Sequence, residues 1–527
     1  MRQLVGAVLI PFAAVAFVPL APRPLLSSAF RTKQIGEVLA RSTAPGVSEL
    51  YAPPAAFNAE AKLSTEAAPE RGQQRDQFQW TQQWYALAAV EYLDEGRAHK
   101  RTLLGRDYVI WFDGQRWRAF ADACPHRLAP LSEGRVEPDG TLMCSYHAWR
   151  FDGQGACTSI PQSPKESRAE HEARTCATSF PVAIKHGVLF VWPEAGPAAE
   201  AAAASKEPVG ISELDDPAFV ARVKTLPLNV RDLPYGWEAF FENVLDPAHV
   251  DVSHHNLVGN RYTGPCPFEI TTERKVSAQE GLAVRVRKEN AVPGLTTVLD
   301  WHPPCHLAIR SEYADGSTAL ISLYASPSSP GRCMHVGQQV LIKSPEGKTP
   351  PGLAFFTLPF PTWMQHQLAS LFLHQDLVFL HNQQRLLVEH GVSPDNFAER
   401  CYMPNAGDKP VVLFKDWLAK LAGGGIPWPA GVDGAAMPRL SRAELFDVYE
   451  THTRDCKYCT GALKNVKRGI RGLRAAALVA ALTAVNRAGR GAVPLAGLAL
   501  TAYAASKGLQ KLERMFHVYE FSHQDNN

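Results

Sequence analysis

The chain has 527 residues, and since a domain typically has about 100–200 residues, it holds more than one domain. Lys plus Arg total 54 and Asp plus Glu total 52, which gives a formal charge of +2, and 46% of the residues are hydrophobic. This balance excludes a disordered acidic protein and a general binder of nucleic acid or other polyanions. Ten cysteines in this length are ordinary usage, so their spacing is more informative than their number.

The N-terminal residues are typical of a targeting sequence. Residues 1–36 carry four basic residues and no acidic residue, and residues 4–21 form an apolar run behind the basic start. The stretch SSAFRTK at 27–33 resembles the Ala-Phe junction in the two-part presequences of algae with complex plastids. We therefore predict a targeting presequence and flexible segment over 1–75 and a location in the plastid, at its envelope or thylakoid membrane. Plain secretion is the alternative.

Short β-type runs separated by turn residues begin near Trp84. The runs WYALAAV, RTLLGRDYVIWF and HGVLFVWP alternate with turn signals, among them Asp113-Gly114. They predict a small all-β domain over 80–194.

Two Cys/His pairs lie in the expected loops of this domain. Cys124 and His126 form a Cys-x-His pair, and Cys144 and His147 form a Cys-x-x-His pair after 17 intervening residues. Two such loops suit a [2Fe–2S] cluster with two thiolates on one iron and two imidazoles on the other. Imidazole ligands raise the reduction potential above that of an all-Cys ferredoxin, so the cluster can accept electrons from one. Zinc is the alternative, although a zinc finger has shorter spacing and a His-x(3–5)-His half.

An Ala-rich, low-complexity stretch follows the all-β domain. Residues 195–210 include the sequence EAAAASKEP, which predicts a linker between this domain and a second one over 211–455.

The second domain opens with a pair of histidines. Asp246-Pro247 predicts a helix start with Asp246 as N-cap, and His249 and His254 follow it. Five residues on an ideal helix turn by about 500°, so the two side chains point roughly 140° apart. A shared metal therefore requires the helix to break between them. Two imidazoles and one carboxylate are the ligand set of non-haem Fe(II) oxygenases, and His255 is expected to be a neighbour instead of a ligand.

The third ligand is expected further along the chain. Residues 361–390 have helical apolar spacing after Pro361, and Asp376 lies among them. Asp376 is the predicted ligand, because an acidic residue on an inward helix face is unusual as core. The alternative is an exposed acid on an amphipathic helix, with Glu389 and Asp395 as the other carboxylates to consider.

These motifs together resemble one protein family. The stretches CPHRLAPLSEGR and GTLMCSYHAWRFDG, with the pattern N-x-x-D-x-x-H-x4-H at 243–254, resemble the Rieske-type non-haem iron oxygenases over about 80–455. The match is nearest to their plastid branch, which includes pheophorbide a oxygenase, a translocon-associated Rieske protein and protochlorophyllide-linked relatives. Ala148 departs from that branch, which usually has Gly after the ligand histidine, and this methyl group is expected to change loop packing without changing ligation.

The resemblance implies an α+β fold and an assembly. The expected order is an all-β Rieske [2Fe–2S] domain, a catalytic domain of antiparallel sheet plus helices with a mononuclear iron, and a C-terminal Ala-rich helical segment. The resemblance also implies a homotrimer, in which Asp246 hydrogen-bonds a cluster histidine of one subunit to an iron histidine of its neighbour. Asn243 is then expected to orient the ligands.

A second cysteine pair opens the C-terminal segment, 456–527. Cys456 and Cys459 form a Cys-x-x-Cys motif, and members of the plastid branch have such a pair. The resemblance implies a redox dithiol open to a thioredoxin-like partner. The alternatives are structural thiols and a zinc half-site, for which no second Cys/His pair lies nearby in the sequence.

Apolar runs follow this motif. A basic stretch at 464–474 precedes apolar runs at 475–485 and 491–505, each shorter than the ~18–20 residues that cross a bilayer. They predict membrane association through a hairpin or amphipathic helices. A buried helical pair is the alternative.

The function that the resemblance implies is oxygenation of a chlorophyll-derived tetrapyrrole with ferredoxin electrons and O2, with ring-opening of pheophorbide a as the leading activity. The alternatives are a hydroxylase of another tetrapyrrole or phyllobilin, and a non-catalytic redox or import component of the plastid envelope. A vestigial iron site should have lost a ligand. Since the expected residues are all present, the sequence favours an enzyme.

Overall fold

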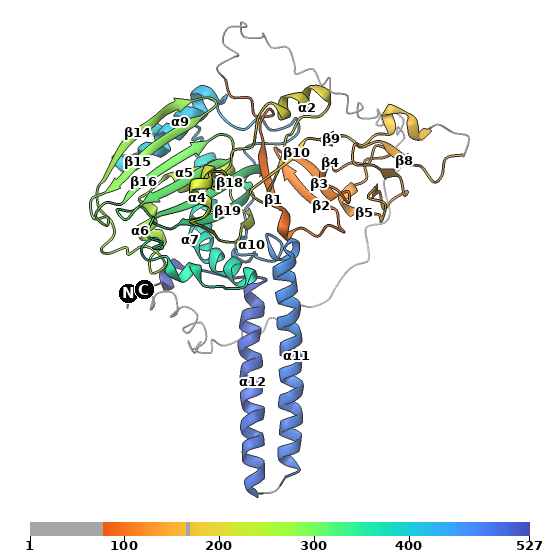
Figure 1. The fold of residues 1–527 in the computed structure, drawn as a ribbon, viewed down its shortest axis with the longest axis vertical. Helices are drawn as coiled ribbons and strands as arrows, with labels where there is room; N and C mark the ends of the chain where they lie inside the picture. The colour runs from red at the N-terminus through yellow and green to blue at the C-terminus, as the bar shows by residue number, and fades with distance from the viewer. Residues whose placement is uncertain (1–76, 165–168, 488, 527) are drawn as a thin grey trace, which may run out of the picture. The chain divides into compact units, whose positions relative to one another are not determined.

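The structure is a computed structural model that describes residues 77–164, 169–487 and 489–526. The predicted presequence over 1–75 lies outside the described residues. The described part confirms the predicted α+β class, with antiparallel sheets followed by long helices (Figure 1).

The N-terminal domain is all-β, as predicted, and consists of three small antiparallel sheets. Their orders are β1-β11-β10, β2-β3-β4-β9 and β5-β6-β7-β8. A compact core around Trp111, Phe120 and Phe151 also contains Cys124 and Cys144. The two candidate cysteine ligands are therefore part of a packed hydrophobic interior. The strands are β1 Tyr85–Ala89, β2 His99–Leu103, β3 Arg106–Phe112, β4 Trp117–Ala121, β5 Arg135–Val136, β6 Leu142–Met143, β7 Arg150–Phe151, β8 Cys157–Ser159, β9 Ser179–Phe180, β10 Val182–Lys185 and β11 Val188–Val191.

The Ala-rich stretch at 195–210 contains a helix, α2 Pro197–Ala204. Ala199 and Ala203 are buried, so one face of this helix packs against the protein. Alanine has the highest helix propensity, which explains a helix where low complexity suggested a linker. The linker boundaries stay a prediction.

The second domain is built on one eight-stranded antiparallel sheet. Its order is β12-β19-β18-β17-β16-β15-β14, and β13 also pairs with β19. This sheet agrees with the expected catalytic domain of antiparallel sheet plus helices, and strands β14 to β19 lie between His254 and Asp376 in the sequence. The strands are β12 Val223–Thr225, β13 Asn229–Leu233, β14 Phe268–Ser277, β15 Gly281–Lys288, β16 Thr296–His302, β17 His306–Glu312, β18 Thr318–Ser329 and β19 Arg332–Ile342.

Helices α5, α7 and α9 pack against this sheet. An aromatic core lies beneath them, in which Trp237 contacts Phe414 and Trp301 contacts Trp417. Trp80, ahead of β1, joins this core with its ring centroid 5.2 Å from that of Trp237, so the two domains share a hydrophobic interior. The helices of this part are α3 Ser212–Asp215, α4 Pro217–Val220, α5 Trp237–Leu245, α6 His249–Ser253, α7 Thr362–Glu389, α8 Phe397–Arg400, α9 Lys409–Leu421 and α10 Arg442–Leu445.

Two long helices close the chain, α11 Lys457–Val485 and α12 Ala492–Met515. They pack side by side as an antiparallel hairpin (Figure 1). Within the described residues, neither of these helices nor any other has the length and apolar character to span a bilayer.

Candidate metal centres

The cluster candidates lie in two loops with the same backbone geometry. Cys124 lies between β4 and β5, and Cys144 lies between β6 and β7. In each loop the cysteine N–H donates at 2.8 Å to the carbonyl five residues later, and the cysteine carbonyl accepts from the N–H four residues later. The residues that donate to the cysteine carbonyls, Leu128 and Ala148, have φ angles of +59° and +58° in the left-handed region. The two loops therefore present their cysteines with the same backbone geometry.

The sulfur atoms of these loops are buried and the imidazoles lie outside them. Cys124 and Cys144 are 2% and 1% exposed, whereas His126 is exposed and His147 is half-buried. The two imidazole centroids lie 4.6 Å apart, and the ring of His126 stacks on Trp149. Burial raises the pKa of Cys124, so a thiolate there needs a positive partner such as iron. This donor set fits a cluster with sulfur ligands inside and imidazole edges facing outward.

A second group gathers around helix α6. Donor atoms of His249, His254 and Asp376 all lie within 4.8 Å of one another. Helix α6 ends at Ser253, and His254 follows as its C-cap with φ −94° and ψ 35°. The end of the helix turns the second imidazole toward the first, with ring centroids 5.3 Å apart, as a shared metal requires. Asp376 joins them from α7.

Hydrogen bonds orient both imidazoles of this group. Nδ1 of His249 donates to the carbonyl of Asp246 at 2.6 Å, and Nδ1 of His254 donates to the amide oxygen of Gln375 at 2.8 Å. Because a carbonyl oxygen only accepts, each Nδ1 carries the proton and each Nε2 has a free lone pair. Nε2 of His254 lies 3.3 Å from Oδ2 of Asp376. The free lone pairs and the carboxylate are the donors that a divalent ion needs.

The charges at this group also favour a cation. Burial raises the pKa of Asp376, but His254, His249 and Ser253 together bring it below its usual value, so the carboxylate is ionised. Burial lowers the pKa of His254, but Asp376 and Gln375 together bring it above its usual value. Asp376 is only 7% exposed, and a buried anion requires a partner of opposite charge. Iron between the three side chains fits this requirement.

Asp246 does not occupy the predicted N-cap position. It is the C-cap of α5, while α6 begins at His249 with Ala248 as N-cap. Its Oδ1 nevertheless accepts the N–H of Ala248 at 2.7 Å, so the side chain caps a local turn whose backbone is not yet helical. Oδ2 lies 4.0 Å from Nδ1 of His249, and the side chain is 30% exposed. Asn243 is half-buried on α5, and its carbonyl accepts the N–H of Asp246.

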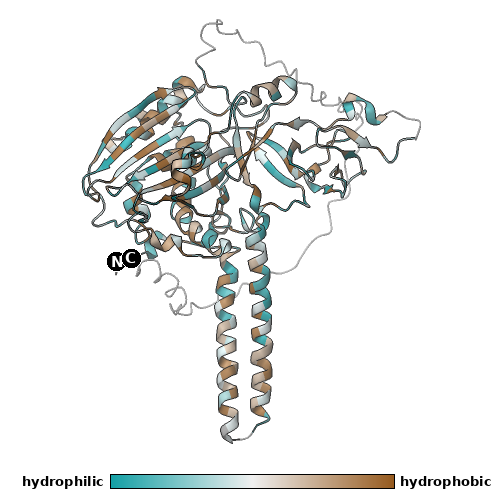
Figure 2. Ribbon diagram, viewed as in Figure 1, coloured by the Kyte–Doolittle hydropathy of each residue, from teal (hydrophilic) through white to brown (hydrophobic). Residues whose placement is uncertain are grey.

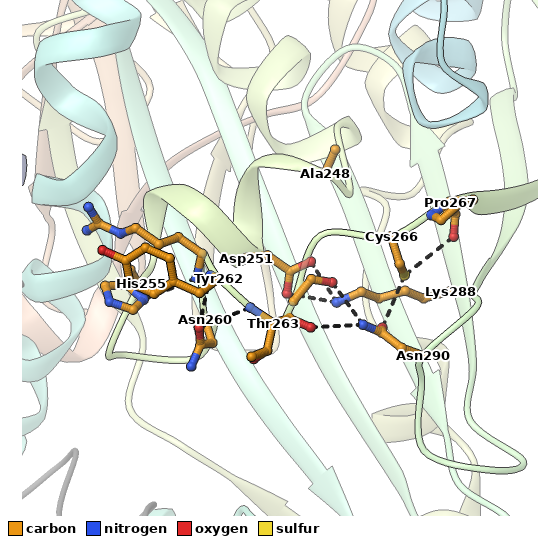
Figure 3. A network of polar contacts seen from close by, with 12 residues as sticks. Ala248, Asp251, His255, Asn260, Tyr262, Thr263, Cys266, Pro267, Lys288 and Asn290 are labelled. Carbon is orange, nitrogen blue, oxygen red and sulfur yellow. Dashed lines mark hydrogen bonds and ion pairs between the residues drawn. The ribbon is translucent and has the colours of Figure 1, made fainter.

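His255 is buried beside the group but is not one of its members. Its Nδ1 accepts the N–H of Arg261 at 3.1 Å, and its ring meets Tyr262 edge to face. Figure 3 shows the loop that follows α6 together with Asp251 of α6, which pairs with Lys288 of β15. These contacts fasten α6 and its loop to the sheet.

The two fallback carboxylates lie outside the group. Glu389 pairs with Arg385 and Arg439 near the end of α7. Asp395 follows α7 and is likewise not among the residues whose donor atoms come together with the histidines. Among the described residues, Asp376 is the acid that joins both imidazoles.

Sequence reasoning missed the side chains that support these ligands. Gln375 orients His254, and Ser253 donates to Oδ1 of Asp376. His523, after α12, donates from Nε2 to the carbonyl of Gln375 at 2.6 Å. Gln375 and Ser253 each stand directly before a candidate ligand, and this position is a signal that could have found them. His523 is 148 residues from Gln375 in the chain, and no sequence signal points to it.

The second cysteine pair lies at the start of α11. Cys456 is its N-cap and Cys459 lies in its first turn. Both are buried, and their sulfur atoms face two buried histidines, His366 of α7 and His452. Sequence reasoning missed these histidines for two reasons. His366 is 90 residues from Cys456, and His452, although it precedes Cys456 by four residues, is a single histidine that forms no second pair.

Comparisons with known proteins agree with this division of the chain. Residues 83–181 match the Rieske [2Fe-2S] domain family, and residues 301–393 match the pheophorbide a oxygenase family. The second match includes β17 to β19 and all of α7, with Asp376. A Rieske [2Fe–2S] cluster and a mononuclear iron are therefore the cofactors.

Similar proteins cover most of the chain. Flavonoid 8-hydroxylase 2 of Ocimum basilicum is 31% identical over 87% of this chain and 88% of its own length. Pheophorbide a oxygenase of Oryza sativa subsp. japonica is 31% identical over 85% of this chain and 87% of its own length. Protochlorophyllide-dependent translocon component 52 of Arabidopsis thaliana is 30% identical over 85% and 86%. The chain therefore belongs to the Rieske-type non-haem iron oxygenases, in the branch that includes pheophorbide a oxygenase.

Proposed function

We propose that this protein is a monooxygenase that uses ferredoxin electrons and O2 to open the macrocycle of pheophorbide a. The net reaction consumes two electrons, two protons and one O2. One oxygen atom of O2 enters the product and the other leaves as water, while a water molecule supplies the second carbonyl oxygen of the opened ring. Iron supplies the activation of dioxygen, and the cluster delivers electrons singly.

The grouping of His249, His254 and Asp376 carries this proposal. We assign the mononuclear iron to these three side chains and the cluster to the two Cys/His loops around Cys124 and Cys144. Three protein ligands would leave coordination positions of a bound iron open to dioxygen. The protein residues hold the ligands in the correct tautomer, keep Asp376 ionised and exclude water through burial.

Asp246 is assigned to electron transfer between subunits. Its carboxylate is partly exposed while its backbone carbonyl orients His249, so it can reach a donor on another chain without leaving the iron site. In a homotrimer that donor is a cluster imidazole of a neighbouring subunit, and His126 is exposed as this requires. Asn243 is assigned a supporting role in the same turn.

Flavonoid hydroxylation is a second candidate activity. It is supported by the flavonoid 8-hydroxylase of Ocimum basilicum, which is as similar to this chain as the rice pheophorbide a oxygenase is. We favour the tetrapyrrole because residues 301–393, which hold Asp376 and strands β17 to β19 of the sheet, match the pheophorbide a oxygenase family. Hydroxylation of another tetrapyrrole or phyllobilin uses the same site chemistry.

We place the enzyme in the plastid, at a membrane that the α11–α12 hairpin meets. The relatives named above are chloroplast proteins, which supports this location. Hydrophobic residues lie along both helices toward their connection, as the brown parts of the ribbon in Figure 2 show. Several of their side chains are exposed. They include Leu482 and Val485 of α11 and Val493 and Leu500 of α12.

Turnover of a substrate panel tests the proposal. The purified protein is supplied with reduced ferredoxin, labelled dioxygen and one of pheophorbide a, chlorophyllide, a bilin or a flavone. We expect one labelled oxygen in a ring-opened product of pheophorbide a. The variants His249→Ala and Asp376→Asn should keep the cluster spectrum but lose turnover. The loss should exceed the ~10–100-fold that is typical when a residue hydrogen-bonded to a metal ligand is changed, because here the ligand itself is removed.

Glu389→Gln is the matched control, since it removes another carboxylate from the same helix. It should retain turnover. Labelled product from the flavone alone would replace the tetrapyrrole assignment, and full turnover by Asp376→Asn would defeat the ligand assignment. A wild-type iron content of about two per chain instead of about three would indicate a cluster-only redox or import component.

A further inference from the structure

Four buried side chains meet at the base of helix α11, away from both iron centres. They are His366 of α7, His452, Cys456 and Cys459, and their exposed fractions are 2%, 6%, 3% and 0%. Their donor atoms all lie within 4.8 Å of one another. We propose that these two imidazoles and two thiolates bind one structural zinc ion.

The hydrogen bonds of the histidines leave two lone pairs facing each other. Nε2 of His366 donates to the carbonyl of Leu228 at 3.0 Å, and Nδ1 of His452 donates to the carbonyl of Val230 at 2.7 Å. The opposite nitrogens, Nδ1 of His366 and Nε2 of His452, therefore carry no proton, and they lie 3.1 Å apart. Two acceptors at this distance repel each other unless a cation or a shared proton lies between them. A backbone carbonyl behind each ring is the usual support of a metal-bound histidine.

The donor distances fit a single tetrahedral ion. Zinc with bonds of ~2.0–2.1 Å to nitrogen and ~2.3 Å to sulfur separates its ligand atoms by about 3.3–3.8 Å. Here Sγ of Cys459 lies 3.3 Å from Nε2 of His452 and 3.4 Å from Nδ1 of His366, and Sγ of Cys456 lies 3.7 Å from the same Nδ1. The four Rieske candidates, which serve two irons, do not form such a compact group among the described residues. The geometry thus suits one ion better than a cluster.

The charge and softness of the donors select zinc. Sulfur and imidazole ligands favour zinc over magnesium or calcium, and four protein ligands with no open position are typical of a structural site. Binding converts two thiols to thiolates and releases two protons to solvent. The two negative charges then balance the dication, so the buried centre is neutral overall.

The ion ties together elements that are distant in the sequence. His366 belongs to α7, the helix that also carries Asp376, and the supporting carbonyls of Leu228 and Val230 lie just before and within β13. Cys456 and Cys459 open α11. Zinc therefore clamps the base of the hairpin to the catalytic domain, which explains a Cys-x-x-Cys pair with no second pair nearby in the sequence.

Metal analysis of the full-length protein with its cofactors tests the site. We expect about one zinc per chain in addition to about three irons. Absorption spectroscopy at the zinc edge should give two sulfur ligands at ~2.3 Å and two nitrogen ligands at ~2.0 Å. This measurement uses the wild-type protein, so it does not depend on whether a variant folds.

Variants provide the second arm. Cys459→Ser and His452→Gln should lose most of the zinc while the Rieske cluster spectrum shows that the protein is folded. Cys305→Ser and His335→Gln are matched controls, because both residues are buried in the same domain but are not among the four whose donor atoms come together. Both variants should retain zinc. His249→Ala should also retain zinc, which separates this inference from the proposed oxygenase function.

Three outcomes overturn the inference. The first is wild-type protein without zinc in which Cys456 and Cys459 form a disulfide that a thioredoxin reduces, since that result establishes the redox dithiol. The second is a fourth iron in place of zinc. The third is zinc whose edge spectrum lacks sulfur ligands, because that ion is bound elsewhere.

Discussion

At the scale of single residues, Ala148 has a strained backbone conformation that both cluster loops share. It follows the candidate cluster ligand His147 and has φ +58°, a conformation that costs an L-residue about 1–2 kcal/mol. Its counterpart in the other loop, Leu128, has φ +59°. The strain is a consequence of the loop geometry, because the N–H at each of these positions must turn back to the cysteine carbonyl.

Replacing Ala148 by glycine should stabilise the cluster loop. Glycine removes the strain but has about 0.5–1 kcal/mol more chain entropy to lose, so the net gain is about 0.5–1 kcal/mol. The midpoint of thermal cluster loss, followed by visible absorption, should rise by about 1–3 °C. Ala123→Gly is the control, since Ala123 lies in the other loop without a positive φ and should lower the midpoint. An unchanged or lowered midpoint for Ala148→Gly would mean that the methyl group has a packing role.

The residues that could be predicted from the sequence are those whose partners lie close in the chain. The cluster pairs and the two histidines of the iron group stand within short motifs. Asp376 was predicted from its place in a stretch with helical apolar spacing and not from its partners. His366 and Cys459 are 93 residues apart, and His523 and Gln375 are 148 apart. The residues of such pairs come together only in the folded protein, so no local sequence pattern predicts them.

At the scale of elements, α5 is held to α9 by a buried charge cluster. Lys415 of α9 lies 3.1 Å from Glu238 and also pairs with Glu242, both on α5. The side chain of Lys415 is 6% exposed and that of Glu242 is 11% exposed. Burial raises the pKa of Glu242, and Lys415 opposes that rise. Because Asn243 and Asp246 end the same helix, this cluster also positions the candidate iron site.

Lys415→Met should destabilise the protein by about 3–5 kcal/mol, because it leaves a carboxylate buried without its cation. The urea midpoint at neutral pH should fall accordingly. Without Lys415 the pKa of Glu242 in the folded state lies further above its value in the unfolded state. Stability is therefore lost as pH rises from the unfolded-state pKa toward the folded-state pKa, and little is lost at a pH below both. The deficit relative to wild type should therefore shrink toward acid pH.

Lys420→Met is the control for this change, since Lys420 lies on the same helix but is exposed and pairs only at the surface with Asp416. It should change the free energy of unfolding by less than about 1 kcal/mol. A deficit for Lys415→Met that does not depend on pH would attribute the loss to packing and not to the charge of Glu242.

Elements were easier to predict than their ends. Helical apolar spacing after Pro361 predicted α7, and the need for a shared metal predicted that α6 ends before His254. The start of α6 was predicted two residues early, because Asp246 caps a turn that precedes the helix. The helix within 195–210 was missed because composition reports low complexity, whereas the buried face of α2 depends on what the fold places beside it.

At the scale of the whole molecule, the hairpin has the dimensions of a membrane anchor that enters one leaflet. The apolar end of α11 at 475–485 is about 16 Å long, roughly half of the ~30 Å hydrocarbon core. Five basic residues at 464–474 precede this end, where they can meet anionic lipid headgroups. With zinc at its base, such a hairpin would hold the catalytic domain at a fixed place beside the membrane surface, where an apolar tetrapyrrole concentrates.

Acidic residues at the hairpin tip should abolish this attachment. Leu482 and Val485 are 57% and 84% exposed, and burying each in lipid contributes roughly 1.5–3 kcal/mol. The double variant Leu482→Glu/Val485→Glu should therefore bind anionic phosphatidylglycerol vesicles at least about tenfold more weakly in a flotation assay.

Val292→Glu is the control, because Val292 is 56% exposed on the catalytic domain, and it should float like wild type. Arg471→Glu should weaken flotation mainly at low salt, since its contribution is screened by ions. Turnover of detergent-dispersed substrate should be equal in all four proteins, because the tip is remote in sequence from the iron ligands and contributes none of them. Undiminished flotation of the double variant would show that the exposed apolar tip is not the membrane contact, and loss of turnover in it would show that the hairpin acts on the catalytic domain directly.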